Sequence, residues 1–201
     1  MRDEGVVVIG LGEKARREAE LCVESLRRSN GGLEVKVITP DFSPASQPAA
    51  KGEGNESRWV KVNLDRLTPF EETLYLDADT RVNLDVGAGF EMLEDGWELV
   101  IGASEHQGED ILWHVGEEEK RRTVEELGYT PLQLQGGVFF FRKCERVSKF
   151  FEVWREEWGR WGDQDQAALL RALNRQPVRV WMLGKPWVNG AVVAHLFGRC
   201  R

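Results

Sequence analysis

The first forty residues hold the pattern that most restricts the fold of this chain: a buried strand, an amphipathic helix and a second buried strand. Residues 6–9 are Val-Val-Val-Ile, a short apolar run that is followed by two glycines. Residues 13–28 repeat apolar side chains three and four positions apart, which is typical of a helix with one face on a core. Residues 35–39 read as the next strand. A strand, helix and strand in this order predict a parallel pair with a right-handed crossover.

Strands and helices continue to alternate along the chain. Further strands are predicted at residues 74–76, 99–102, 135–142 and 178–183, and further helices at residues 117–127, 147–158 and 163–173. Residues 41–57 are rich in Pro, Ser, Gly and Ala and read as a loop. This order predicts an α/β fold: one domain over residues 1–201, with a mostly parallel, mixed sheet flanked by helices. Ligands of such sheets bind at the carboxyl ends of strands.

Charge and composition narrow the range of partners. The net charge of −7 disfavours binding to nucleic acid or to an anionic membrane. No apolar run is long enough to span a membrane. The three cysteines lie far apart, without metal-ligand spacing, and the chain start has no secretory character, so a soluble cytoplasmic protein with reduced thiols is expected.

Residues 74–80, Leu-Tyr-Leu-Asp-Ala-Asp-Thr, place two carboxylates at the end of an apolar strand. If the strand breaks into a turn there, Asp77 and Asp79 can converge on one small volume. Like charges at that distance repel, and a divalent cation such as Mg²⁺ or Mn²⁺ removes the cost. The alternative is an ordinary turn in which the aspartates only bond to nearby backbone.

Four further segments stand in a set order around this pair. They are Lys61, sixteen residues before Asp77; the run 135–141, which contains Gly136 and Gly137; Asp163-Gln164-Asp165; and His195 followed by Gly198. Together with residues 74–80 they resemble the motifs of nucleotide-sugar glycosyltransferases of the GT-A fold. The likeness is closest to the retaining family 8 (glycogenin- and galactosyltransferase-like), whose motifs are a donor-contacting Lys or Arg, YLDaD, N-x-G-v, D-Q-D and H-x-x-G.

The resemblance implies a metal-dependent enzyme that moves a sugar from a nucleoside diphosphate sugar, with UDP expected, to an unknown acceptor. It also implies retention at the anomeric carbon and Mn²⁺ or Mg²⁺ as cofactor. The implied metal ligands are Asp77, Asp79 and His195. The residues expected to act in catalysis are Asp163, Gln164 and Lys61. Those expected to contact the donor are Gly10, Lys61, Asp77, Ala78, Asp79, Gly136, Gly137, Lys185 and Gly198.

The chemistry of the transfer explains these residue types. Breaking the glycosyl C–O bond leaves charge on the β-phosphate, and a bridging cation stabilises it as a Lewis acid. Lysines neutralise the remaining phosphate charge, and paired glycines let a backbone approach the sugar ring. The chain also departs from the family pattern: Gln135 or Gly136 replaces the usual Asn, and Lys185-Pro186-Trp187 precedes His195 instead of following it.

Three other functions compete with this hypothesis. Residues 10–15 fit the dinucleotide fingerprint G-x-G-x-x-A, but the acidic candidate Asp41 lies 31 residues after Gly10, not roughly 20. A sugar-phosphate nucleotidyltransferase would use a similar sheet and metal. A noncatalytic sugar-nucleotide binding module would keep only the donor site.

Structural interpretations compete at individual residues. Asp163 and Gln166 fit a capping box, and His195 ends an apolar run, where a packed histidine is common. A core stripe is favoured for three tryptophans at helical spacing, Trp154, Trp158 and Trp161.

Overall fold

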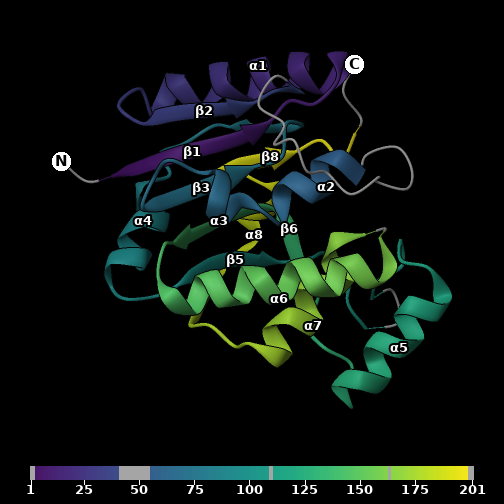
Figure 1. The fold of residues 1–201 in the computed structure, drawn as a ribbon. Coiled ribbons are helices and arrows are strands. Elements are labelled where there is room, and N and C mark those ends of the chain that lie inside the picture. The colour runs from purple at the N-terminus through teal and green to yellow at the C-terminus, as the bar shows by residue number, and fades with distance from the viewer. Residues whose placement is uncertain (1–2, 41–54, 109–110, 163, 199–201) are drawn as a thin grey trace.

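A six-stranded sheet with helices on both faces organises the protein (Figure 1). The computed structural model describes residues 3–40, 55–108, 111–162 and 164–198. The strand order is β2-β1-β3-β6-β5-β7. These strands are β1 (Glu4–Ile9), β2 (Glu34–Ile38), β3 (Glu72–Leu76), β5 (Leu99–Ala103), β6 (Leu134–Arg142) and β7 (Val180–Leu183). A separate two-stranded sheet pairs β4 (Thr80–Val82) with β8 (Val193–His195).

Strand directions confirm the predicted fold class. β1 lies parallel to β2 and β3, and β7 lies parallel to β5. β6 runs antiparallel to both of its neighbours, β3 and β5. The connection between β1 and β2 is the helix α1 (Glu13–Ser29), as the opening pattern predicts. The sheet is therefore mixed and mostly parallel.

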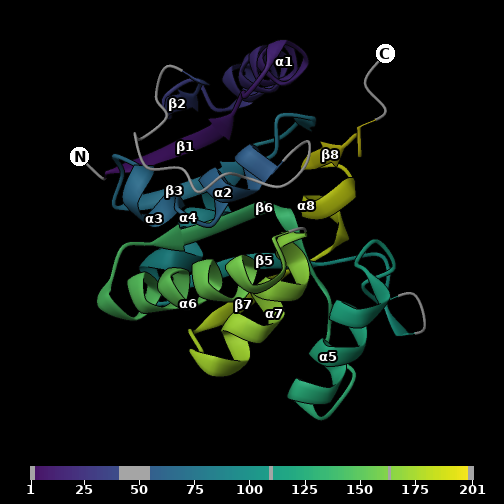
Figure 2. The same ribbon diagram turned by 45° about the vertical axis from the view of Figure 1, so that its right-hand side comes forward.

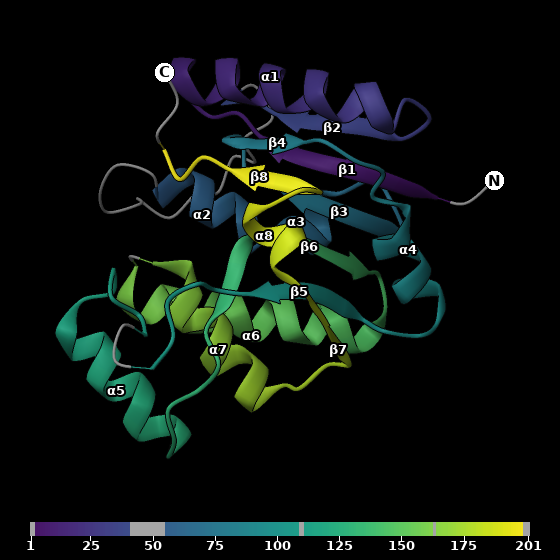
Figure 3. The same cartoon turned by 180° about the vertical axis from the view of Figure 1, so that it is seen from behind.

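Helices cover the two faces of this sheet. Figure 1 looks onto the face covered by α6 and α7, and Figure 3 shows α4, α8 and the β4–β8 pair on the other side. The remaining helices are α2 (Asn55–Lys61), α3 (Leu64–Leu67), α4 (Gly87–Glu94), α5 (Glu117–Leu127), α6 (Glu145–Trp161), α7 (Asp165–Arg175) and α8 (Lys185–Asn189). No helix in the described part of the chain is both long and apolar enough to cross a membrane.

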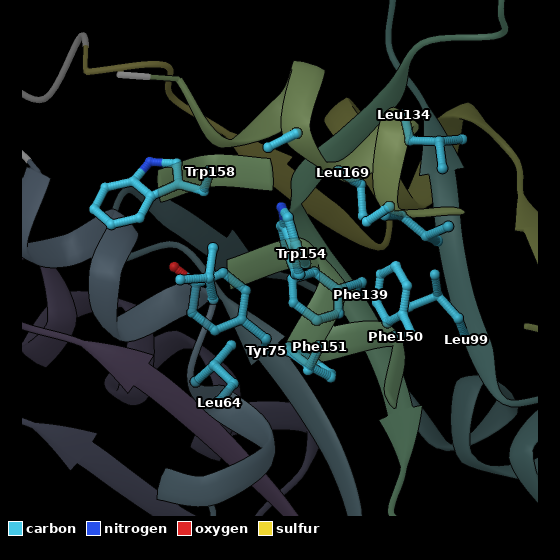
Figure 4. Packing of buried hydrophobic residues seen from close by; sticks show 14 of the residues in the cluster. Leu64, Tyr75, Leu99, Leu134, Phe139, Phe150, Phe151, Trp154, Trp158 and Leu169 are labelled. Atoms are coloured by element: carbon cyan, nitrogen blue, oxygen red, sulfur yellow. The ribbon is translucent and has the colours of Figure 1, made fainter. Parts of the chain in front are cut away.

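The central strand β6 contributes side chains to the hydrophobic layers on both faces of the sheet. Successive side chains of a strand point to opposite faces, so Phe139 packs with the α6 aromatics while Phe140 packs edge-on against Phe90 of α4. Figure 4 shows Phe139 among Trp154 and other buried rings. Trp154 and Trp158 are buried, which confirms the core interpretation for both.

A buried ionic cluster joins α5, α6 and α7. Arg171 of α7 is 2% exposed and donates to Glu157 of α6 over 2.8 Å and to Glu119 of α5 over 3.0 Å. It also donates to Thr123 over 2.6 Å. Buried charges of this kind require partners, so the cluster fixes how the three helices pack.

Several elements escaped prediction. α2 starts inside the region 41–57 that was predicted as a loop; residues 41–54 lie outside the described residues. Prediction missed α4, whose Gly-Ala-Gly start has low helix propensity, because packing of its apolar side chains against the sheet overrides propensity. The helix predicted from residue 163 starts at Asp165, with Gln164 as its N-cap residue. β4 forms by pairing with β8, more than 100 residues away in sequence, which no local pattern reveals.

Candidate functional site

The site lies where β3 ends and the chain turns into β4. The backbone N–H of Asp77 donates to the carbonyl of Gly137 over 2.8 Å, so the turn is tied to β6. The hydroxyl of Thr80 then donates to the Asp77 carbonyl over 2.8 Å. Because β4 pairs with β8, residue 195 is placed opposite Thr80 and beside the two aspartates. The predicted convergence of Asp77 and Asp79 is therefore present.

Asp77, Asp79 and His195 form a group that could hold a metal ion. One ligand atom from each lies within 4.8 Å of the other two. Nε2 of His195 is 3.1 Å from Oδ1 of Asp79 and 3.7 Å from Oδ2 of Asp77. Two carboxylate oxygens and one imidazole nitrogen form a ligand set that suits Mn²⁺. The two carboxylate oxygens also suit Mg²⁺.

Surrounding backbone supports this arrangement. The N–H of Gly198 donates to Oδ2 of Asp79 over 2.6 Å. Burial works against the charge of Asp79, but the contacts with His195 and with this N–H outweigh burial and lower its pKa. Gly137 leaves the space that the ligands occupy: a Cβ there would lie 2.4 Å from Cε1 of His195 and 2.6 Å from Oδ2 of Asp77. The group is thus a preformed cradle that fits a small cation.

The two oxygens of the Asp77 carboxylate face different partners. Oδ1 accepts a hydrogen bond from the Tyr75 hydroxyl over 2.6 Å and lies 3.1 Å from Nζ of Lys61. Burial, helped by the neighbouring Asp77 charge, raises the pKa of Tyr75 well above 10, so its hydroxyl keeps its proton. Oδ2 is the oxygen that faces His195. The carboxylate is therefore oriented with one oxygen on the metal side.

Lys61 is a buried cation between two acids. Its Nζ lies 3.1 Å from Asp77 and 3.3 Å from Oδ2 of Asp165. Burial alone would lower the pKa of Lys61, but the charges of Asp165 and Asp77 raise it instead. Lys61 therefore stays positively charged beside the candidate metal group.

Gln135 holds His195 and was not predicted to do so. Its Oε1 accepts the Gly137 N–H over 2.6 Å, which directs its Nε2 toward Nδ1 of His195 at 3.2 Å. The other ring nitrogen, Nε2, lies 3.1 Å from Oδ1 of Asp79, so Gln135 helps to keep Nε2 facing the two aspartates. Only the replacement of the family's Asn at this position hinted at an unusual role.

The α7 start contributes two more residues. Asp165 is 6% exposed, faces Lys61, and its Oδ2 would lie 3.4 Å from a Cβ on Gly136. Gln164 precedes it in extended conformation, with no side-chain capping bond. Asp163, the third expected catalytic residue, lies outside the described residues.

A cavity of about 470 Å³ opens onto these groups. Arg58, Lys61, Asp77, Gly136, Gly137 and Gln164 are part of its lining. Both charge signs and a glycine backbone thus meet in one concave space, as expected for a phosphorylated sugar ligand beside a metal.

Three residues that were expected to contact the donor do not line this cavity. Gly10 directly follows β1, where its N–H donates to the carbonyl of Ile38 and its Cα faces α1, and it does not line this cavity. Ala78 occupies the turn between the two aspartates and packs against the core. Lys185 starts α8 with a 77% exposed side chain and pairs with Glu105 at 3.3 Å.

Comparison with known proteins links this geometry to one class of fold. No protein-family model matches the sequence, and no curated protein sequence matches it. Mouse xyloside xylosyltransferase 1 is similar in structure, with a TM-score of 0.61 and 12% identity over 99% of both chains. The galactosyltransferase LgtC, solved with donor and acceptor sugar analogues, gives a TM-score of 0.60 and 14% identity over 98% of this chain and 88% of its own. WbbM, a bifunctional glycosyltransferase, gives 0.64 and 13% over 90% of this chain and 39% of its own.

At such identities structural similarity establishes the fold. The expected resemblance is confirmed at the level of the fold by several neighbours whose names describe them as glycosyltransferases. This chain has the fold of the GT-A glycosyltransferases.

Proposed function

We propose that this protein transfers a sugar from a nucleoside diphosphate sugar, with UDP as the expected nucleotide, to an acceptor hydroxyl. Mn²⁺ or Mg²⁺ bound by Asp77, Asp79 and His195 would serve as cofactor. The observation that carries this proposal is the convergence of those three side chains within 4.8 Å at the carboxyl end of β3. A GT-A fold supplies the context, since neighbours of this fold are glycosyltransferases.

The chain's own residues fit the demands of the reaction. A bound divalent cation would supply Lewis-acid stabilisation of the leaving diphosphate. Lys61 would remain cationic beside it and offset phosphate charge, and Arg58 lines the same cavity. The Gly136–Gly137 backbone would allow a sugar ring to lie close to β6.

Asp165 would act on the sugar itself. Its carboxylate points to the same cavity from the α7 start, where it can offset the positive charge that develops at the anomeric carbon. Gln164 lies next to it and offers a neutral amide. Retention remains part of the proposal on the strength of the family 8 likeness.

The test is metal-dependent turnover of UDP-sugars by the purified protein. Hydrolysis or transfer with UDP-glucose, UDP-galactose or UDP-xylose should require Mn²⁺ or Mg²⁺ and stop with a chelator. Asp77→Asn should abolish turnover, because it removes a ligand charge. Asp95→Asn changes an exposed aspartate at the end of α4 and should leave turnover unchanged.

Two results would count against the proposal. Asp77→Asn turning over donors like the unmodified protein would remove the metal group from the reaction. Pyrophosphate release from a sugar 1-phosphate and UTP, without transfer from UDP-sugars, would favour a nucleotidyltransferase instead.

A further inference from the structure

A second cavity of about 580 Å³ adjoins the one described above. Gln135, Gln166, His195 and Phe197 line both cavities, so a molecule in the second would lie next to a donor in the first. Its outer wall comes from residues 104–106 and 113–114, which lie between β5 and α5, on the side of the molecule where α5 projects (Figure 2). Of the described residues that were expected to act in catalysis, contact the donor or hold the metal, His195 alone lines the second cavity.

An exposed tryptophan forms part of that outer wall. Trp113 is 62% exposed, although large apolar side chains usually seek burial. His106 and His114 contact it, with ring centroids 5.2 Å and 5.5 Å from the indole. Flanking rings of this kind fix the indole in place, so that a flat apolar face is presented to a ligand.

Polar groups in the cavity are suited to hydroxyls. Nε2 of His114 is enclosed and has no hydrogen-bond partner among the described residues. Burial lowers the pKa of His114 below its usual 6.5, so the ring is neutral near pH 7 and can accept or donate one hydrogen bond. Ser104 and the carboxylate of Glu105 also line the space.

The charges of the residues that line the second cavity favour a neutral ligand over an anionic one. Within the described residues, the lining contains the Glu105 carboxylate but no lysine or arginine. Lys185 is nearby, but its charge is already paired with Glu105. A phosphorylated or carboxylated ligand would meet no free cation there, whereas a neutral polyol would find aromatic area and hydrogen-bonding groups.

We propose that this second cavity binds a neutral saccharide as the acceptor, with one sugar ring stacked on Trp113. This inference rests on the proposed function and names its acceptor class. In the transfer, an acceptor hydroxyl oxygen would form the new bond to the anomeric carbon. The bond from that carbon to the diphosphate would break, its electron pair would leave with the diphosphate, and the hydroxyl proton would pass to a diphosphate oxygen.

The experiment separates donor chemistry from acceptor binding. Donor hydrolysis and transfer are measured with the UDP-sugars above, Mn²⁺ and a panel of methyl glycosides of glucose, galactose, mannose and xylose, with methyl glucuronide as a charged comparison. Trp113→Ala is compared with Trp113→Phe and with Trp181→Ala, which removes another exposed indole, on the edge strand β7. Thermal unfolding checks that each variant folds.

The expected result is transfer to at least one neutral glycoside. Trp113→Ala should reduce kcat/KM for that glycoside by about tenfold, mainly through KM, because a stacked ring contributes about 1.4 kcal/mol. Donor hydrolysis should not change, Trp113→Phe should keep most of the transfer, and Trp181→Ala should match the unmodified protein.

Three results would overturn the inference while leaving the proposed function standing. They are donor hydrolysis with no transfer to any neutral glycoside, preference for the glucuronide, and equal transfer by Trp113→Ala and the unmodified protein. Absence of any metal-dependent donor turnover would instead remove the proposed function itself.

Discussion

Replacing Gly137 with alanine should disrupt the candidate metal centre directly. The new Cβ would lie 2.4 Å from Cε1 of His195 and 2.6 Å from Oδ2 of Asp77, whereas non-bonded carbons in good contact lie about 3.5–4.0 Å apart. Both side chains would have to retreat by about 1 Å. His195 has little room, because it is 7% exposed and stacks on Phe197 with centroids 4.2 Å apart.

The size of the effect follows from this overlap. Overpacking of such a site costs about 1–3 kcal/mol, which for 201 residues corresponds to a fall in Tm of about 2–12 °C. Ligand distances in metal sites lie within about 0.2 Å of their usual values. Since two of the three ligands would move by more, the affinity for Mn²⁺ should fall at least about tenfold.

The neighbouring glycine provides a matched control. A Cβ on Gly136 would meet only Oδ2 of Asp165, at 3.4 Å, which is an ordinary contact. Gly136→Ala should therefore bind Mn²⁺ like the unmodified protein. The assays are calorimetric titration of Mn²⁺ in the presence of UDP and thermal unfolding without metal. A folded Gly137→Ala protein with undiminished Mn²⁺ affinity would refute the ligand placement.

Two further variants test the buried ionic cluster of α5, α6 and α7 and the contact of Gln135 with His195. Burial opposes the charge of Glu157, but its hydrogen bonds from three arginines lower its pKa below 4.5, so the stability that it contributes is present above pH 4.5 and is lost as the pH falls further. Glu157→Gln should lower the free energy of unfolding in urea by about 3–5 kcal/mol at pH 7, and by less at pH 3. The control Glu20→Gln, at an exposed position, should leave the free energy of unfolding unchanged at both pH values. An effect of Glu157→Gln that is the same at both pH values would contradict this prediction. Gln135→Leu should weaken Mn²⁺ binding about tenfold, because His195 loses the side chain that positions it. Gln135→Glu should bind Mn²⁺ at least as tightly as the unmodified protein, because its carboxylate can accept a hydrogen bond from an N–H at Nδ1 of His195. A Leu variant that binds as well as the Glu variant would exclude Gln135 as a positioning residue.

Local patterns were sufficient for the main part of the fold. The βαβ opening and the core strand β6 were predictable because their apolar runs lie wholly inside the sheet, and burial sets residue type there. The pair Asp77 and Asp79 was predictable because a strand ends just before it. α8 was not: its five residues contain a proline and are too few for a helical period, and the helix packs against β5, β6, β7 and β8.

The site was predictable where order along the chain carried information. His195 is brought to Asp79 by the β4–β8 pairing, which involves residues far apart, so its place came from motif order and not from spacing. The contact of Gln135 with His195 could not be predicted, since it depends on which side chains surround Gln135 in space. Lys185 was expected near the diphosphate, and its pairing with Glu105 is a three-dimensional contact that sequence does not reveal.

The most direct test of the central claim is a titration of Mn²⁺ into the protein with UDP present. We expect one Mn²⁺ per chain, and a loss of affinity of about tenfold or more in each of Asp77→Asn, Asp79→Asn and His195→Ala. Apo forms of these variants should remain folded, as thermal unfolding will show. One bound Mn²⁺ with the same affinity in all three variants, or none in the unmodified protein, would rule out a metal site at these three residues.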